Sequence, residues 1–279
     1  MKIALCNEVI SEKPFEAQCA FAAALGYDSL ELAPYTVGGD APHRMGADTR
    51  AQIRRAAADA GIDFASLHWL LVKPQGLSIT AADPTVRART LDVMRRLVEL
   101  AADLGAHILV HGSPAQRRIP EGDEGAANAA RQRGCDAFAT IAEDAARAGV
   151  VYCIEALAPP GANFVNRIDE AAAIVRAVGS PALRCMIDCS ATSAVEGPDL
   201  AAVADRWLPT GLIAHVQVND VNRRGPGQGH DRFAGLFASL RRHHYDGAVA
   251  VEPFDYVPDG PAAAARAIGY IRGILEAQS

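Results

Sequence analysis

Short apolar runs alternate with longer amphipathic stretches from one end of the chain to the other. The short runs predict buried strands, and the Ala-rich stretches, whose apolar positions recur every three or four residues, predict helices. Regular alternation of this kind is typical of parallel βαβ units. The chain contains eight such pairs, with strands near 3–6, 29–33, 63–68, 107–111, 150–155, 184–188, 212–218 and 248–252 and helices near 14–25, 48–60, 84–104, 125–148, 169–177, 198–206, 231–243 and 261–277. The pattern predicts an α/β fold, a single (β/α)8 TIM barrel over residues 1–279.

The two kinds of connection differ in sequence. In four of the helix-to-strand connections a glycine directly follows the predicted helix, at Gly26, Gly61, Gly105 and Gly149. A helix C-cap requires a left-handed residue at this point. The strand-to-helix connections are longer and more polar, as expected of loops that build a binding site. We therefore expect the chemistry at the carboxyl-terminal end of the barrel.

Four polar residues mark that end. Glu155, Asp188, Gln217 and Glu252 each close an apolar run, and successive members lie about thirty residues apart, the length of one strand-helix-strand unit. A carboxylate at the end of a buried strand is costly unless it is paired, protonated or bound to a cation. One such residue is more often a helix cap or salt-bridge partner, but four in consecutive units favour a hard divalent metal.

Composition narrows the class of protein. The chain has 279 residues, is 50% hydrophobic and carries a net charge of −6, which suits one large barrel and disfavours a nucleic-acid-binding surface. The six cysteines form no CxxC pair and are interpreted as reduced thiols. Because no signal-like leader or membrane-length apolar run is found, we expect a cytoplasmic protein without a membrane partner.

Two sequence motifs add a resemblance. HVQVNDVNRRGPGQG around Gln217 and GAVAVEPF around Glu252 resemble the sugar-phosphate isomerase/epimerase family of xylose isomerase-like barrels, nearest to its ketose 3-epimerase and hydroxypyruvate isomerase branches. The resemblance implies that Glu155, Asp188, Gln217 and Glu252 hold one divalent metal and that the two Glu form the acid/base pair. Ketose 3-epimerases usually have His at the third metal position, so Gln217 is more similar to the hydroxypyruvate isomerase branch. Its hard amide oxygen favours Mg²⁺ or Mn²⁺, with Co²⁺ as an alternative.

The substrate contacts depart from the family pattern. Many relatives carry a substrate-binding His three residues after the metal Asp, but this chain has the sequence DCSA at 188–191. That contact is either missing or supplied from elsewhere. His68 and His111, each at a strand end, are candidates for it, although either could be structural. Arg223 is a third candidate, and it matches a family position that binds substrate oxygens.

Further candidates flank these residues. Arg117 and Arg118 follow the fourth strand, where a guanidinium would suit a substrate phosphate or carboxylate; a solvated surface role is the alternative. Glu31 lies in the run SLEL and is expected to point inward. We expect it to hold a site residue in place or to have a structural role, such as a salt bridge to a neighbouring strand. His215 is expected to have a hydrogen-bonded core role.

The residues and the resemblance together predict an isomerase or epimerase of a small ketose, keto-sugar acid or sugar phosphate. Glu-mediated proton transfer would proceed through an enediolate stabilised by the metal. The same site would also serve a hydroxypyruvate-type isomerase, a dehydratase or a decarboxylase. A DNA-repair endonuclease is disfavoured, because it needs a multi-zinc cluster richer in His and a basic groove. The expected partner is a small carbohydrate, and relatives suggest a homo-dimer or homo-tetramer.

Overall fold

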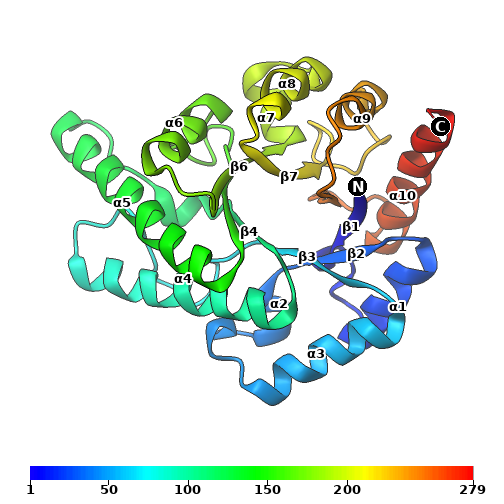
Figure 1. Cartoon of the computed structure of the whole chain (residues 1–279), viewed down its shortest axis with the longest axis horizontal. Helices are drawn as coiled ribbons and strands as arrows, with labels where there is room; N and C mark the ends of the chain where they lie inside the picture. The colour runs from blue at the N-terminus through cyan, green and yellow to red at the C-terminus, as the bar shows by residue number, and fades with distance from the viewer. Residues whose placement is uncertain (279) are drawn as a thin grey trace.

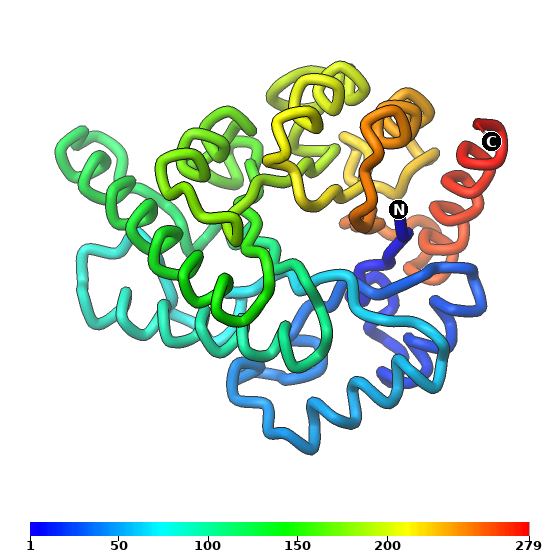
Figure 2. Tube along the Cα trace, viewed as in Figure 1, coloured from blue at the N-terminus to red at the C-terminus, as the bar shows by residue number. Residues whose placement is uncertain are grey.

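Eight parallel strands close into a barrel in sequence order, in a computed structural model that describes residues 1–278. The first strand pairs with the last, with Lys2 opposite Ala248, so the chain path in Figure 2 returns to its start. The strands are β1 (Lys2–Cys6), β2 (Ser29–Leu32), β3 (Asp63–Leu67), β4 (Ile108–His111), β5 (Val151–Ile154), β6 (Leu183–Asp188), β7 (Ile213–Val218) and β8 (Ala248–Val251).

Helices form an outer ring around these strands (Figure 1). They are α1 (Phe15–Leu25), α2 (Pro34–Gly38), α3 (Ala47–Ala60), α4 (Pro84–Leu104), α5 (Glu124–Ala148), α6 (Ile168–Val178), α7 (Cys189–Glu196), α8 (Leu200–Trp207), α9 (Phe233–Arg242) and α10 (Gly260–Ala277). Short 3₁₀ turns η1 (Asn7–Ile10), η2 (Pro42–Arg44), η3 (Pro114–Arg117) and η4 (Leu208–Thr210) lie in the connections. None of the helices in residues 1–278 is both long and apolar enough to cross a bilayer.

The predicted barrel is confirmed, and every predicted strand and helix is present within two residues of its expected ends. The predicted glycine caps are also present. Gly26 and Gly149, for example, have φ of 91° and 71° and end α1 and α5, a conformation that glycine adopts without a Cβ clash. The helices that were not expected, α2 and α7, are both short and lie in strand-to-helix connections.

The direction of each side chain follows from the strand period of two. Val110, Cys153 and Met186 form a small cluster inside the barrel, distinct from the large core between strands and helices. Residues two positions further along share the inward direction. Glu155 and Asp188 therefore point into the carboxyl-terminal end of the barrel.

Candidate active site

The four predicted metal ligands lie at the carboxyl ends of four neighbouring strands. Glu155 follows β5, Asp188 ends β6, Gln217 lies near the end of β7 and Glu252 follows β8. Asp188 and Gln217 are register partners, and the four residues are 7%, 4%, 1% and 4% exposed. The strand-end pattern thus corresponds to one buried polar layer.

The carboxylates of this layer oppose one another's ionisation. Burial, together with the charge of Asp188, raises the pKa of Glu155 to about 8, although the Arg117 guanidinium acts in the opposite direction. Burial also raises the pKa of Glu252 well above its usual value, against the effect of a hydrogen bond from His68. The pKa of Asp188 is raised by burial in the same way. A bound cation would offset this mutual repulsion.

Asp188 also has the cap role that a single strand-end carboxylate often has. Its Oδ1 accepts hydrogen bonds from Ala191 N at 2.7 Å and Ser190 Oγ at 2.9 Å, so it caps α7. Its Oδ2 accepts from Asn219 Nδ2 at 2.8 Å. These bonds hold the carboxylate in one orientation, as outer partners of metal ligands commonly do.

Asn219 is a site residue that sequence reasoning missed. It is fully buried, and besides Asp188 its Nδ2 contacts the main-chain oxygen of Glu252 at 3.1 Å. Its Oδ1 accepts from Ser190 N at 2.8 Å. Asn219 therefore joins the ends of β6 and β8. Its position two residues after Gln217, on the same face of β7, was the available signal.

Two oxygens in the layer are buried and have no hydrogen-bond donor within residues 1–278. They are Gln217 Oε1 and Glu252 Oε2. A buried acceptor without a donor costs about 1–3 kcal/mol, so such atoms call for a ligand. The donor set of one amide and three carboxylates consists of hard oxygens, which suits Mg²⁺ or Mn²⁺.

His68 lies at the same end of the barrel, as predicted, and bridges two carboxylates. Its Nδ1 is 3.1 Å from Glu252 Oε1 and its Nε2 is 2.9 Å from Glu8 Oε2. Trp69 Nε1 donates to the other oxygen of Glu8 at 3.2 Å. Glu8 lies in the turn η1 after β1. It was missed because it does not directly follow the apolar run of a strand.

A second group of ligand-type atoms adjoins the first. Atoms of Cys6, Glu8, His68 and Glu252 all lie within 4.8 Å of one another. However, both ring nitrogens of His68 already face carboxylates, and Cys6 Sγ donates to Glu31 at 3.0 Å. Among the described atoms of this group, the buried one without a hydrogen-bond partner is Glu252 Oε2, which also belongs to the strand-end layer, so we assign the candidate metal position to that layer.

The other predicted substrate-binding residues lie in different environments. His111 packs against the Phe138 ring of α5, with ring centroids 5.0 Å apart, and contacts Tyr152 OH at 2.8 Å. The structure thus places His111 between barrel and helix, not at the mouth, because strand alternation turns it outward. Burial, with the nearby charge of Arg117, lowers its pKa to about 3.

The three candidate arginines also lie in different environments. Arg117 is fully buried, and its Nη1 donates to the main-chain oxygen of Glu155 at 2.6 Å. Arg118 is exposed and donates to the main-chain oxygens of Pro160 and Gly161. Arg223 is exposed on the loop between β7 and α9, with φ of 71°, and its guanidinium lies 5.2 Å from the Phe254 ring centroid. Arg223 is therefore the arginine that stands beside the mouth.

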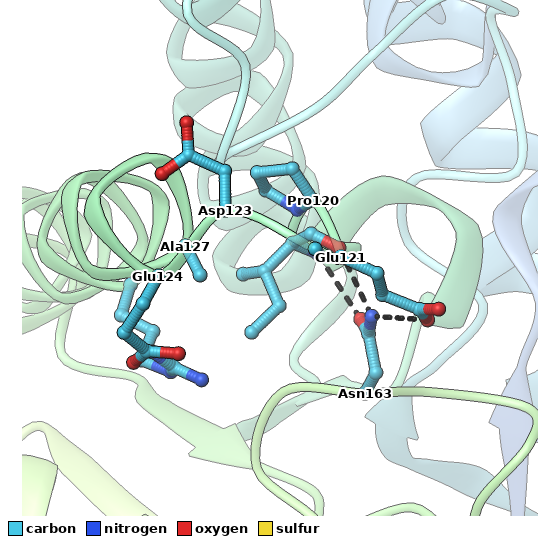
Figure 3. Close-up of a pocket in the computed structure, with 9 residues that line it drawn as sticks. Pro120, Glu121, Asp123, Glu124, Ala127 and Asn163 are labelled. Atoms are coloured by element: carbon cyan, nitrogen blue, oxygen red, sulfur yellow. Dashed lines mark hydrogen bonds and ion pairs between the residues drawn. The ribbon is translucent and has the colours of Figure 1, made fainter.

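A separate surface pocket of about 460 Å³ lies beside the start of α5 (Figure 3). Residues 119–124 line it together with Ala127, Arg131 and Asn163. Asn163 Nδ2 donates to Ile119 O at 2.9 Å and to Glu121 Oε1 at 3.2 Å, which ties two loops together. None of the strand-end residues lines this pocket, so it is distinct from the candidate active site.

The raised carboxyl pKa values predict a pH dependence of the metal-free protein. A carboxyl whose pKa is higher in the folded state keeps a proton that the unfolded chain releases, so the free energy of unfolding falls as pH rises. For Glu155 the window runs from its ordinary value of 4.5 to about 8, with a limit of about 1.4 kcal/mol per pH unit. Urea unfolding of chelated protein across this window should show a steeper loss for the wild type than for Glu155→Gln. Parallel curves would contradict the prediction.

Comparison with known proteins gives a consistent set of relatives. A profile of the xylose isomerase-like TIM-barrel family matches residues 19–274. The D-psicose 3-epimerase of Agrobacterium fabrum is 26% identical over 233 residues, which are 83% of this chain and 76% of that protein. The L-ribulose 3-epimerase of Mesorhizobium japonicum is 28% identical over 206 residues, 72% of this chain and 65% of that protein.

The structural comparison supports the same fold. The 3-keto-D-glucoside 4-epimerase from E. coli superposes with a TM-score of 0.83 at 18% identity, covering 98% of this chain and 99% of that chain. The named relatives support the predicted resemblance to the ketose 3-epimerase branch. On the match over residues 19–274, this chain belongs to the xylose isomerase-like TIM-barrel family.

Proposed function

We propose that this chain is a divalent-metal-dependent sugar epimerase or isomerase that acts on a small ketose or a related keto-sugar acid or sugar phosphate. The proposal is supported by relatives that are ketose 3-epimerases. The observation that carries it is the pair of buried oxygens without donors, Gln217 Oε1 and Glu252 Oε2, in a layer with two further carboxylates. Glu155, Asp188, Gln217 and Glu252 would hold the cation.

Proton transfer is the chemistry that this chain's own residues would perform. A divalent cation, when bound, polarises a substrate carbonyl and makes the neighbouring C–H more acidic. Glu155 and Glu252 follow β5 and β8, which are separated by two strands of the barrel on one side. Such a placement suits proton removal by one Glu and return by the other on the opposite face, as an epimerisation requires.

The two Glu differ in their surroundings. Glu252 Oε1 contacts His68, which in turn contacts Glu8, whereas the Glu155 carboxylate lies beside Gly112, close enough that a Cβ on residue 112 would clash with it. We propose that His68 holds Glu252 in place. The barrel interior around both residues excludes bulk water, because each is less than a tenth exposed, and this strengthens electrostatic effects on the reacting proton.

Substrate contacts would come from the rim of the mouth. The main-chain oxygen of Arg223 accepts from Phe254 N at 2.8 Å and Asp255 N at 2.9 Å, so the loop is anchored beside Glu252. The Trp69 ring meets the Phe254 ring edge to face, with centroids 6.4 Å apart. An aromatic wall beneath an exposed guanidinium suits a polar sugar with an apolar face.

Arg117 retains two buried nitrogens without acceptors among the described residues, and we propose it as a contact for an anionic substrate group.

Metal analysis tests the proposal directly. Purified protein should contain about one divalent ion per chain by mass spectrometry, and exhaustive chelation should abolish epimerisation of D-psicose or L-ribulose until Mn²⁺ is added back. Asp188→Ala should lose the ion. Asp205→Ala removes an exposed carboxylate that is 41% accessible and should retain it. Full activity after chelation would refute the metal-dependent function.

A further inference from the structure

Glu31 is a buried carboxylate that contacts four other side chains beside the candidate metal layer. It is fully buried in β2, where strand register places it between Cys6 and Ser66. Its Oε1 accepts from Cys6 Sγ at 3.0 Å and from Gln217 Nε2 at 2.6 Å. Its Oε2 accepts from Ser66 Oγ and lies 2.7 Å from His215 Nε2. Oε1 therefore accepts two hydrogen bonds, and Oε2 accepts one and lies beside the His215 ring.

Glu31 is surrounded by groups that can donate a hydrogen bond. They are the Cys6 thiol, the Ser66 hydroxyl, the Gln217 NH₂ group and the His215 ring. The oxygens of a carboxylate accept hydrogen bonds. The side chain of β7 that faces Glu31 is therefore held best when it presents a donor.

Gln217 has two chemically different ends of nearly identical shape. Rotation of the amide by half a turn exchanges Oε1 with the NH₂ group at little steric cost. Asp188, Glu155 and Glu252 would attract the NH₂ group electrostatically, and such a contact would close the cation position. Glu31 competes for the same NH₂ group from the other side of the amide.

The hydrogen bonds of Gln217 show which orientation prevails. Its Nε2 donates to Glu31, while its Oε1 is buried with no donor in residues 1–278. The distance from Gln217 Nε2 to the Glu31 carboxylate is 2.6 Å. Asp188, the register partner of Gln217 on β6, is a neighbouring carboxylate of the candidate metal layer. The amide oxygen of Gln217 therefore remains without a hydrogen-bond donor and is available as a metal ligand beside the three carboxylates.

We propose that Glu31 is a positioning residue that selects the orientation of the Gln217 amide, so that the amide oxygen and not the NH₂ group is presented to a divalent cation. This inference rests on the proposed metal-dependent function. The contact with Glu31 explains how Gln217 can serve as a metal ligand, although its amide in the rotated orientation would present the NH₂ group to the cation. It assigns to the buried carboxylate of β2 a role in metal affinity without direct contact with the metal.

A reciprocal exchange tests the proposal through Mn²⁺ affinity, measured by calorimetry on metal-free protein. Glu31→Gln allows either amide orientation at residue 217 and should weaken Mn²⁺ binding by about 10-fold to 100-fold, the range for outer partners of metal ligands. Gln217→Glu alone opposes two carboxylates and should also weaken it near neutral pH. The double variant restores one amide donating to one carboxylate, so it should bind Mn²⁺ more tightly than either single variant.

Ser66→Ala is the matched control. It removes a hydrogen bond to the other oxygen of Glu31 and leaves the contact with Gln217 intact, so Mn²⁺ affinity should stay near that of the wild type. Circular dichroism and thermal melting report whether each variant folds. If Glu31→Gln does not fold, Glu31→Asp keeps the charge beside His215 and should weaken binding by about twofold to tenfold through a poorer hydrogen bond.

The outcomes separate the two proposals. If the wild type binds Mn²⁺ and a folded Glu31→Gln variant binds it equally well, the role of Glu31 is refuted and the metal site stands. The same holds if the double variant binds no more tightly than the tighter-binding of the two single variants. If the wild type binds no divalent cation at all, the proposed metal-dependent function fails, and the role of Glu31 fails with it.

Discussion

Glu155→Gln and Glu252→Gln are each expected to lower turnover by at least about a hundredfold, the low end for loss of a general base. Glutamine keeps the size of the side chain and one oxygen donor but does not accept a proton at neutral pH. Each variant should therefore still bind a divalent cation, although less tightly. In an epimerase the two substitutions should differ, because each Glu serves one face: each variant should slow proton removal from one epimer more than from the other.

Deuterium incorporation provides the decisive measurement for this pair. In D₂O, product formed by the wild type should carry deuterium at the reacting carbon, as proton exchange requires. Glu16→Gln, an exposed carboxylate on α1, should leave turnover unchanged and controls for the loss of a charge. Product without deuterium at the reacting carbon would indicate a hydride shift or chemistry without proton transfer. The assignment of both Glu would then have to be abandoned.

Gly112→Ala is expected to reduce activity severely while leaving the fold nearly intact. A Cβ at residue 112 would lie 2.2 Å from Glu155 Oε2 and 3.3 Å from Glu155 Cδ, too close for either to remain in place. The clash falls on the free end of a side chain, so the carboxylate would move instead of the backbone. Since a displacement of about 1 Å in a reacting group costs about a hundredfold in rate, we expect a loss similar to that of Glu155→Gln.

The matched control for this substitution is Gly273→Ala. Gly273 lies in α10, where an added Cβ would meet no atom of the described chain within 4 Å, and Ala at an open helical site is expected to stabilise the protein by about 0.5–1 kcal/mol. Turnover and melting temperature should be measured for both variants. Gly112→Ala should lose turnover with little change in melting temperature, and Gly273→Ala should keep turnover. Normal kinetics in Gly112→Ala would show that the carboxylate of Glu155 does not need its present position.

The barrel and the strand-end layer were predictable because both depend on local pattern. In parallel strands of one sheet, equivalent sequence positions meet at one edge, so Glu155, Asp188, Gln217 and Glu252 were bound to lie close once the alternation of strands and helices was recognised. Helix α7 was not anticipated, although Asp188 is its N-cap. A cap residue that also ends a strand gives no separate signal in the sequence.

The face occupied by a single residue was less predictable. A shift of one residue along a strand exchanges the inside and outside of the barrel, and the end of a short strand gives few neighbours from which to judge. His111 was expected at the mouth but packs against Phe138 of α5. For Arg117 a solvated surface role was one alternative, and the structure excludes it, because Arg117 lies fully buried with its Nη1 on the main chain of Glu155.

Sequence alone determined the fold and the layer of metal-type residues, because these follow from periodicity and spacing along the chain, and its motifs around Gln217 and Glu252 carried the family resemblance. Only the tertiary structure decided which groups meet across the barrel. Glu31 and Gln217 are 186 residues apart and His68 and Glu252 are 184 residues apart, and neither contact leaves a trace in local sequence. Closure of the barrel brings β2 and β3 opposite β7 and β8, and the hydrogen bonds formed there determine which atom of each side chain faces the site.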